Sequence, residues 1–219
     1  MFAEHLNRVK EGANSVYTLK NLSAYVTTYM FLEGKRYTFG DKYGFKADII
    51  DDTSRVTNTV KPAQIGLTVS TMAYITAAAC TQAKFNAIYS LPTSSDATKL
   101  VTTKLNPLIY NSPELKRLLD PNVDNNELKK LGNNFIFIRG SRSETAALSI
   151  SADALVADEI DRSDPDTLKQ FRSRLQASEF QIIKQFSTPT IEGVGISKEA
   201  EASKRKRHFA TCNCCGYKW

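Results

Sequence analysis

The sequence predicts an α/β fold in which helices cover both faces of a mainly parallel central sheet. Short apolar, strand-like runs alternate along the chain with helical segments, which is the pattern of such folds. The 219 residues suit one sizeable domain, and 42% hydrophobic with 24% charged residues is an ordinary globular composition. Polar stretches follow three of the predicted strands, as ligand sites do at the carboxyl ends of parallel strands.

The first part of the chain is expected to supply the first strand and the helix that follows it. Residues 1–34 place apolar positions at helical spacing, so we predict one or two amphipathic helices there. Residues 35–53 are rich in aromatic residues, glycine and charge, and we expect irregular structure. A strand is predicted near residues 54–60, and a helix without breakers at 68–82.

The rest of the chain repeats this alternation. We predict strands at residues 85–91, 135–139, 154–161 and 181–187. We predict helices at residues 96–109, 113–119 and 165–178, the last capped by Asp164 before a proline at its first position. The asparagine-rich residues 121–134 are expected to form turns.

Charge and hydropathy narrow the class of partner. The formal net charge of +6 and the isoelectric point near 9.1 mildly favour a polyanion, although much of the excess lies in residues 204–207. The chain lacks the run of about 20 apolar residues that a membrane helix needs, and its start does not resemble a signal peptide. We therefore expect a cytosolic protein without a membrane partner.

The stretch KPAQIGLT, residues 61–68, lies between a predicted strand and a predicted helix, as a nucleotide phosphate loop does. It departs from the spelling G-x-x-x-x-G-K-[ST], because Lys61 replaces the first glycine and Leu67 replaces the lysine. Gly66 and Thr68 match; the glycine lets the backbone approach phosphates, and the hydroxyl can bind Mg²⁺. Since the lysine's role requires only a flexible cation, Lys61 can fill it from the start of the loop.

A second chemical stretch, ALVADEID at residues 154–161, is an apolar run that ends in acids. Asp158 can hold Mg²⁺ through water, and Glu159 can orient and deprotonate an attacking water. The plainer alternative is a strand end that reaches solvent in an acidic turn. About 90 residues separate the two stretches, which leaves room for an added strand between them.

Together these stretches resemble the ATPase domain of tailed-phage large terminase subunits, in the GpA-like branch that includes lambda's enzyme. The resemblance spans roughly residues 36–217 and implies a P-loop NTPase of the RecA-like type with an added strand and a catalytic glutamate. It implies ATP and Mg²⁺, and a motor that drives double-stranded DNA into a procapsid in the host cytoplasm. It also implies a portal protein and a small terminase subunit as partners, with a homo-oligomeric ring during packaging or a monomer in isolation.

The resemblance assigns roles to residues of the two motifs, called Walker A and Walker B. Lys61 would neutralise phosphate charge, Thr68 and Asp158 would hold Mg²⁺, and Glu159 would be the catalytic base. The implied ATP-binding residues are Lys61, Pro62, Ala63, Gln64, Ile65, Gly66, Leu67, Thr68 and Tyr43. Tyr43 is our choice for stacking on adenine, with Phe39 close behind. Ser187, Thr188 and Pro189 match the family's coupling motif, and the alternative is a polar turn ended by proline.

A motor of this kind also uses an arginine to stabilise transition-state charge. Arg139 and Arg142 are the candidates, with Arg162 as a third. Arg172 and Arg174 are candidates for contact with DNA or with a neighbouring subunit, and the sequence leaves that choice open.

Cysteines divide into one isolated residue and a cluster in the tail. Cys80 lies in a helical pattern and is expected to be buried. Cys212 and Cys215 form a Cys-x-x-Cys-Gly turn, which we interpret as half of a zinc site that the longer protein would complete. The alternative is a set of reactive thiols near the terminus.

We expect three parts: a helical and adenine-side lead-in (residues 1–53), the P-loop ATPase core (54–195), and a basic linker with a half zinc knuckle (196–219). Large terminases carry a second, nuclease domain for which this sequence is too short, so we expect no nuclease activity. The chain is then either a fragment, which its end just after the half knuckle favours, or the product of a short gene. Two other functions stay open. One is a helicase-like DNA-dependent ATPase, and the other is a non-catalytic nucleic-acid-binding module with a decayed ATP loop.

Overall fold

The computed structural model describes residues 16–40, 43–142, 150–204, 206 and 214–216. In this part of the chain, strands β1 and β2 are Phe31–Leu32 and Lys35–Arg36, and the main sheet consists of β3 (Val56–Val60), β4 (Ala87–Leu91), β5 (Leu119–Asp124), β6 (Leu128–Leu131), β7 (Asn134–Gly140), β8 (Ala154–Asp158) and β9 (Ile182–Ser187). The helices are α2 (Leu22–Tyr29), α3 (Phe45–Asp51), α4 (Leu67–Thr81), α5 (Ser94–Leu100), α6 (Asn106–Tyr110), α7 (Pro113–Leu118), α8 (Pro165–Ser173) and α9 (Ile196–Glu201).

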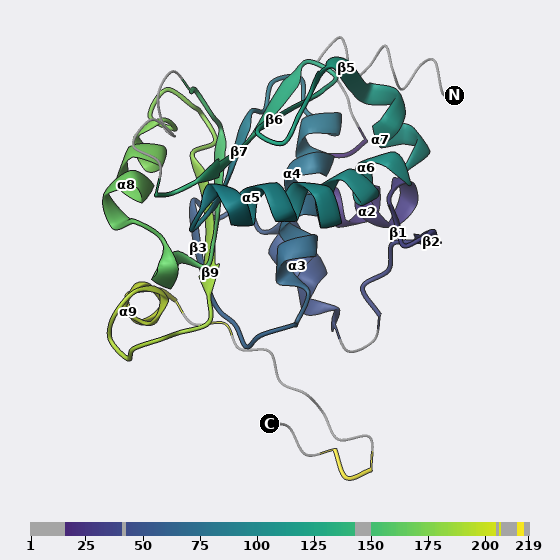
Figure 1. Ribbon diagram of the computed structural model, residues 1–219. Helices are drawn as coiled ribbons and strands as arrows, with labels where there is room; N and C mark the ends of the chain where they lie inside the picture. Colours follow the sequence, from purple (N-terminus) through teal and green to yellow (C-terminus); the bar gives the residue numbers. More distant parts are fainter. Residues whose placement is uncertain (1–15, 41–42, 143–149, 205, 207–213, 217–219) are drawn as a thin grey trace.

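The main sheet has the strand order β3-β9-β8-β4-β7-β6-β5. The first five strands of this order are parallel, and β6 and β5 extend the sheet by antiparallel pairing. Helices α2 to α7 lie on one side of the sheet, and α8 and α9 lie on the other (Figure 1). The predicted α/β class with a mainly parallel sheet is confirmed. Strands β4 to β7 lie in sequence between the two motif-bearing strands β3 and β8, whereas β9, which follows both in sequence, lies between them in the sheet.

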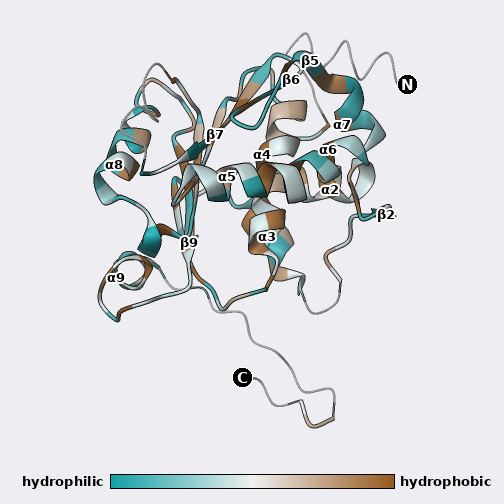
Figure 2. Cartoon of the chain, in the orientation of Figure 1, coloured by the Kyte–Doolittle hydropathy of each residue, from teal (hydrophilic) through white to brown (hydrophobic). Residues whose placement is uncertain are grey.

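The core consists of two apolar layers, one on each face of the sheet. Alternate residues of a strand point to opposite faces, and in β4 Tyr89 belongs to the layer under α4 while Ile88 belongs to the layer under α8. Helix α4 is buried along nearly its whole length, and Figure 2 shows it among the more hydrophobic helices. A helix that is apolar on all sides is stable only inside the protein, so α4 is held against the sheet.

The segment that was expected to form turns is ordered as strands, so this prediction was wrong. Residues 119–131 form the antiparallel pair β5 and β6 in place of turns. Lys130 binds Asp120 across this pair at 3.0 Å, and buried Lys129 binds Asp124. These cross-strand ion pairs and the alternating burial of β6 explain why the segment adds to the sheet.

Helix boundaries differ from the predicted ones in a few places. Helix α3 forms within residues predicted to be irregular. The helix predicted at 96–109 is broken by a π-helical segment at Val101–Leu105. Helix α8 begins as predicted, because Asp164 accepts a hydrogen bond from the Thr167 amide at 2.8 Å, but it ends at Ser173. Within the described residues, helices of the length and apolarity that a membrane span requires are absent.

Candidate active site

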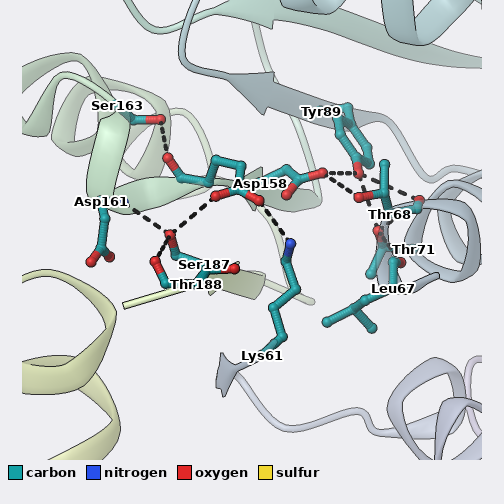
Figure 3. Close-up of polar contacts among 11 residues, drawn as sticks. Lys61, Leu67, Thr68, Thr71, Tyr89, Asp158, Asp161, Ser163, Ser187 and Thr188 are labelled. Atoms are coloured by element: carbon teal, nitrogen blue, oxygen red, sulfur yellow. Dashed lines mark hydrogen bonds and ion pairs between the residues drawn. The ribbon is translucent and has the colours of Figure 1, made fainter. Parts of the chain in front are cut away.

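The candidate site lies at the edge of the sheet where β3, β8 and β9 end. These parallel strands deliver Lys61, Asp158 and Ser187 to one place (Figure 3). Glu159 directly follows Asp158 and contacts Lys61 there. The Lys61 amide donates a hydrogen bond to the Ser187 carbonyl at 3.1 Å, which fixes the start of the loop to the end of β9. The chemical stretches that lie far apart in the sequence therefore come together here.

The loop at residues 61–66 joins β3 to the N-terminus of α4. Gln64 and Gly66 both adopt left-handed backbone conformations, with φ of 63° and 74°. A non-glycine residue rarely adopts this conformation, so the loop stores strain at Gln64. The turn directs the chain into α4, whose N-terminal amides and dipole favour an anion. The loop therefore has the geometry for binding phosphate, and the predicted residues Lys61 to Thr68 all belong to it or to the first turn of α4.

Thr68 and Asp158 are in direct contact across the site. The Thr68 hydroxyl donates to Asp158 Oδ2 at 2.8 Å, and the Tyr89 hydroxyl donates to the same oxygen at 3.2 Å. Asp158 is only 2% exposed, and its other oxygen, Oδ1, is buried and has no hydrogen-bond partner among the described residues. A buried carboxylate oxygen without a partner is costly. Hydroxyl and carboxylate oxygens are ligands of Mg²⁺, so this pair fits such a cation.

Burial controls the charge of these groups. It raises the pKa of Asp158 to about 6, and the hydrogen bond from Thr68 and the charge of Lys61 offset part of that rise. Burial also raises the pKa of Tyr89 well above its usual value, so this hydroxyl stays protonated and can donate to Asp158. A cation beside Asp158 would stabilise its ionised form, which the protein alone disfavours.

The raised pKa of Asp158 predicts how the stability of the metal-free protein depends on pH. Between the unfolded pKa of about 3.9 and the folded value of about 6, the folded state binds more protons, so this group's contribution to stability is lost as pH rises. The free energy of unfolding of Asp158→Asn, measured relative to that of the wild type, should therefore increase by about 2–3 kcal/mol as pH rises through this range. At higher pH we expect no further change in this difference. Urea unfolding of both proteins from pH 4.5 to 8 measures the difference, from which the other carboxylates cancel. A constant difference across this range would contradict the assignment.

Lys61 and Glu159 form an ion pair. The ammonium lies 2.7 Å from Glu159 Oε1, and the lysine side chain is 8% exposed against 30% for the glutamate. Glu159 has left-handed backbone angles, φ 56° and ψ 52°. Ser163 donates to its carbonyl at 3.2 Å, which helps to hold this strained position. Ser187 reaches the second carboxylate oxygen only at 3.5 Å.

Of the three candidate arginines, Arg142 and Arg162 are brought together. Arg142 donates to the Arg162 carbonyl at 3.2 Å, just after the acidic stretch. Arg139 instead donates to the Glu127 carbonyl at 2.8 Å, at the turn between β5 and β6. Among the described residues, Arg142 therefore contacts the segment after Glu159 that contains Arg162, whereas Arg139 contacts the turn between β5 and β6.

The remaining predicted residues have varied surroundings. Arg172 donates to Gln185 at 2.7 Å and lies 3.8 Å from Glu199, within the polar layer between α8, β9 and α9. Arg174 has a buried Nε atom without a partner among the described residues. Tyr43 is 42% exposed, whereas Phe39 packs against the core and meets the Tyr37 ring in a T-shaped, edge-to-face contact. The exposed ring of Tyr43 is therefore the better placed of the two aromatic candidates.

Two residues of this region were missed by sequence reasoning. Tyr89 contacts Asp158 from the neighbouring strand β4, and its hydroxyl also lies 3.2 Å from that of Thr71. Asp161, in the 3₁₀ helix Ile160–Arg162, accepts hydrogen bonds from the amides of Thr190 (3.0 Å) and Ile196 (2.8 Å). Asp161 thus ties the end of the acidic stretch to the segment that follows Pro189. The sequence signal for Tyr89 was a hydroxyl within an apolar strand, and the signal for Asp161 was a second acidic residue shortly after Glu159.

The cysteine predictions are met only in part by described residues. Cys80 is buried in α4, as expected, and its pKa is raised to about 12 by burial. Cys212 lies outside the described residues, and Cys214 and Cys215 are exposed free thiols. Clusters of three or more potential metal-ligating side chains are absent from the part of the chain that the structure describes. The half zinc site stays a prediction.

Comparison with known proteins identifies a matching family and structures with a similar fold. The family described as "Phage terminase large subunit gpA, ATPase domain" matches residues 45–218. The large terminase of bacteriophage HK97 has a similar fold, with a TM-score of 0.72 and 11% identity over 83% of this chain. The large terminase of a thermophilic bacteriophage matches over 81% of this chain, with a TM-score of 0.46 and 13% identity.

This chain spans 40% of the length of each of these two terminases. A comparison with curated proteins finds no match. The family match covers most of the chain and includes the loop at 61–68, the acidic stretch and the end of β9. The chain therefore belongs to the family of phage terminase large subunit gpA ATPase domains.

Proposed function

We propose that this chain is an ATP-hydrolysing motor domain that drives double-stranded DNA into a phage procapsid. The observation that carries the proposal is the ion pair of Lys61 and Glu159 beside the hydrogen-bonded pair of Thr68 and Asp158. One site thus holds a cation for phosphate, a carboxylate for water activation and two oxygen ligands for a metal. Phosphoryl transfer requires these three elements together.

The ion pair suggests how nucleotide binding prepares the catalytic base. Lys61 is the cation at the start of the phosphate loop, and its ammonium is paired with Glu159. A bound triphosphate competes for the same ammonium. When Lys61 turns to the phosphates, Glu159 is released to accept a proton from the attacking water. The lysine therefore binds substrate and also keeps the base inactive until substrate is present.

Thr68 and Asp158 would hold Mg²⁺, which when bound supplies positive charge to the oxygens of the β- and γ-phosphates. Tyr89 fixes the orientation of the Asp158 carboxylate through its hydrogen bond to Oδ2. This contact leaves Oδ1 as the oxygen available to a ligand. Removing the Tyr89 hydroxyl would therefore loosen a ligand without removing it.

Movement requires that hydrolysis change the position of another element. Ser187, Thr188 and Pro189 follow β9 and are the proposed coupling motif. Asp161 ties the residues after this motif to the acidic stretch and to the start of α9. A displacement at Glu159 would thus reach α9 through a short, hydrogen-bonded path. We propose that this is the route from the reaction to the moving parts.

The proposal extends to the assembly. The motor would act in the host cytoplasm as a ring of subunits, with a portal protein and a small terminase subunit as partners. Arg142 or Arg162 would supply charge to the transition state, in the same subunit or in its neighbour. Cys212 and Cys215 of the tail would supply half of a zinc site, and the longer protein would supply its other ligands.

The proposal is tested by equilibrium binding of a non-hydrolysable ATP analogue with and without Mg²⁺, followed by hydrolysis assays with and without duplex DNA. We expect saturable, Mg²⁺-dependent binding and ATP turnover that duplex DNA increases. A folded protein that binds no nucleotide would overturn the proposal in favour of a nucleic-acid-binding module. Strand separation without movement along duplex DNA would favour a helicase-like ATPase.

A further inference from the structure

We propose that Lys46 is a second cation for the nucleotide phosphates and acts at the opposite end of the phosphate loop from Lys61. The inference rests on the proposed function, because it concerns the same nucleotide site. It assigns a binding role to a residue of α3, which lies outside both nucleotide motifs. The ligands concerned are nucleoside di- and triphosphates.

The first observation is the position of the Lys46 ammonium against the loop. A Cβ atom added to Gly66 would lie 2.8 Å from Lys46 Nζ and 3.7 Å from its Cε. The ammonium therefore occupies the space that a side chain at Gly66 would fill. Gly66 is the last residue before α4, so Lys46 lies beside the helix N-terminus toward which phosphates are drawn.

The second observation is that this cation lacks an anion. None of the carboxylates in the described ranges lies within ion-pair distance of Lys46, and partial burial lowers its pKa. A positive charge that is partly removed from water, beside the positive end of a helix, is unfavourable until an anion binds. Lys61, by contrast, is already paired with Glu159. Among the described residues, Lys61 therefore has a carboxylate partner and Lys46 does not.

The third observation is that the position of Lys46 is held from two sides. Its ammonium lies 4.1 Å from the centre of the Tyr43 ring, a favourable cation–π contact. The helix that carries it is anchored to the sheet, because buried Lys184 of β9 donates to the carbonyls of Ile49 (2.8 Å) and Asp52 (2.6 Å) at the far end of α3. Lys46 is therefore placed beside the loop before nucleotide binds, which lowers the cost of binding.

The test compares Lys46→Met, which keeps the apolar stem, with Lys46→Arg, which keeps the charge. We expect the methionine variant to bind Mg²⁺–ADP and a Mg²⁺-bound, non-hydrolysable ATP analogue about tenfold or more weakly than the wild type, as for a lost hydrogen bond to a charged group. The arginine variant should stay within about threefold of the wild type. Lys99→Met removes an exposed helical lysine of α5 and is expected to leave affinity unchanged.

Thermal unfolding of each variant confirms that the fold is retained. Wild-type affinity in Lys46→Met would overturn the inference while leaving the proposed function intact. An equal loss of affinity in the methionine and arginine variants would assign Lys46 a packing role and would also overturn it. A folded wild-type protein that binds neither nucleotide would overturn both proposals.

Discussion

Replacing Glu159 by glutamine is expected to lower ATP turnover by about 100-fold or more, as for other lost general bases, while nucleotide still binds. Glutamine has nearly the same shape as glutamate, so the strained backbone position and the hydrogen bond from Ser163 are retained. The amide cannot accept the proton of the attacking water. It also cannot form an ion pair with the Lys61 ammonium, which lies 2.7 Å from the native carboxylate, although its carbonyl oxygen can still accept a hydrogen bond. We therefore expect nucleotide affinity to stay equal or to increase.

Steady-state hydrolysis and equilibrium binding of the ATP analogue separate these two effects. Glu127→Gln is the matched control, because Glu127 lies at the turn between β5 and β6, where its carboxylate is 3.4 Å from Arg139. That variant should keep wild-type turnover. Undiminished turnover in Glu159→Gln would remove the assignment of the base. Reduced affinity in the same variant would contradict the proposed competition for Lys61.

The alternation of apolar runs and helical segments was sufficient to predict the sheet and its parallel character. It also located the site, because the carboxyl ends of parallel strands share one edge. Lys61, Asp158 and Ser187 were therefore expected near one another before any contact was known. The hydrogen bond from the Lys61 amide to the Ser187 carbonyl is the direct result of β9 pairing beside β3.

The segments that sequence reasoning missed depend on contacts between distant residues. The β5–β6 pair contains asparagines and lysines that locally favour turns, and cross-strand ion pairs such as Lys130 with Asp120 outweigh that preference. The contact of Tyr89 with Asp158 depends on β4 being the neighbour of β8, an order that local pattern does not reveal. The approach of Lys46 to Gly66 likewise depends on how α3 packs against α4.

Replacing Lys61 by alanine is expected to abolish measurable ATP hydrolysis and to weaken binding of the ATP analogue by about 10- to 100-fold, the range for a lost charged contact. The lysine is nearly buried, whereas its partner Glu159 is 30% exposed, so the carboxylate can be solvated when the ammonium is gone. The protein should therefore stay folded. Thermal unfolding, titration with the analogue and hydrolysis assays measure the three expectations.

The double variant Lys61→Ala with Glu159→Gln tests the link between the two residues. If nucleotide and Glu159 compete for one ammonium, Glu159→Gln can increase affinity only while Lys61 is present, so the two effects will not add. Additive effects would mean that the ion pair of the free protein does not oppose binding. Wild-type turnover in Lys61→Ala would go further, because the loop would then hold phosphates without its moved lysine. Lys46, whose ammonium has no carboxylate partner among the described residues, would remain as the cation at the loop.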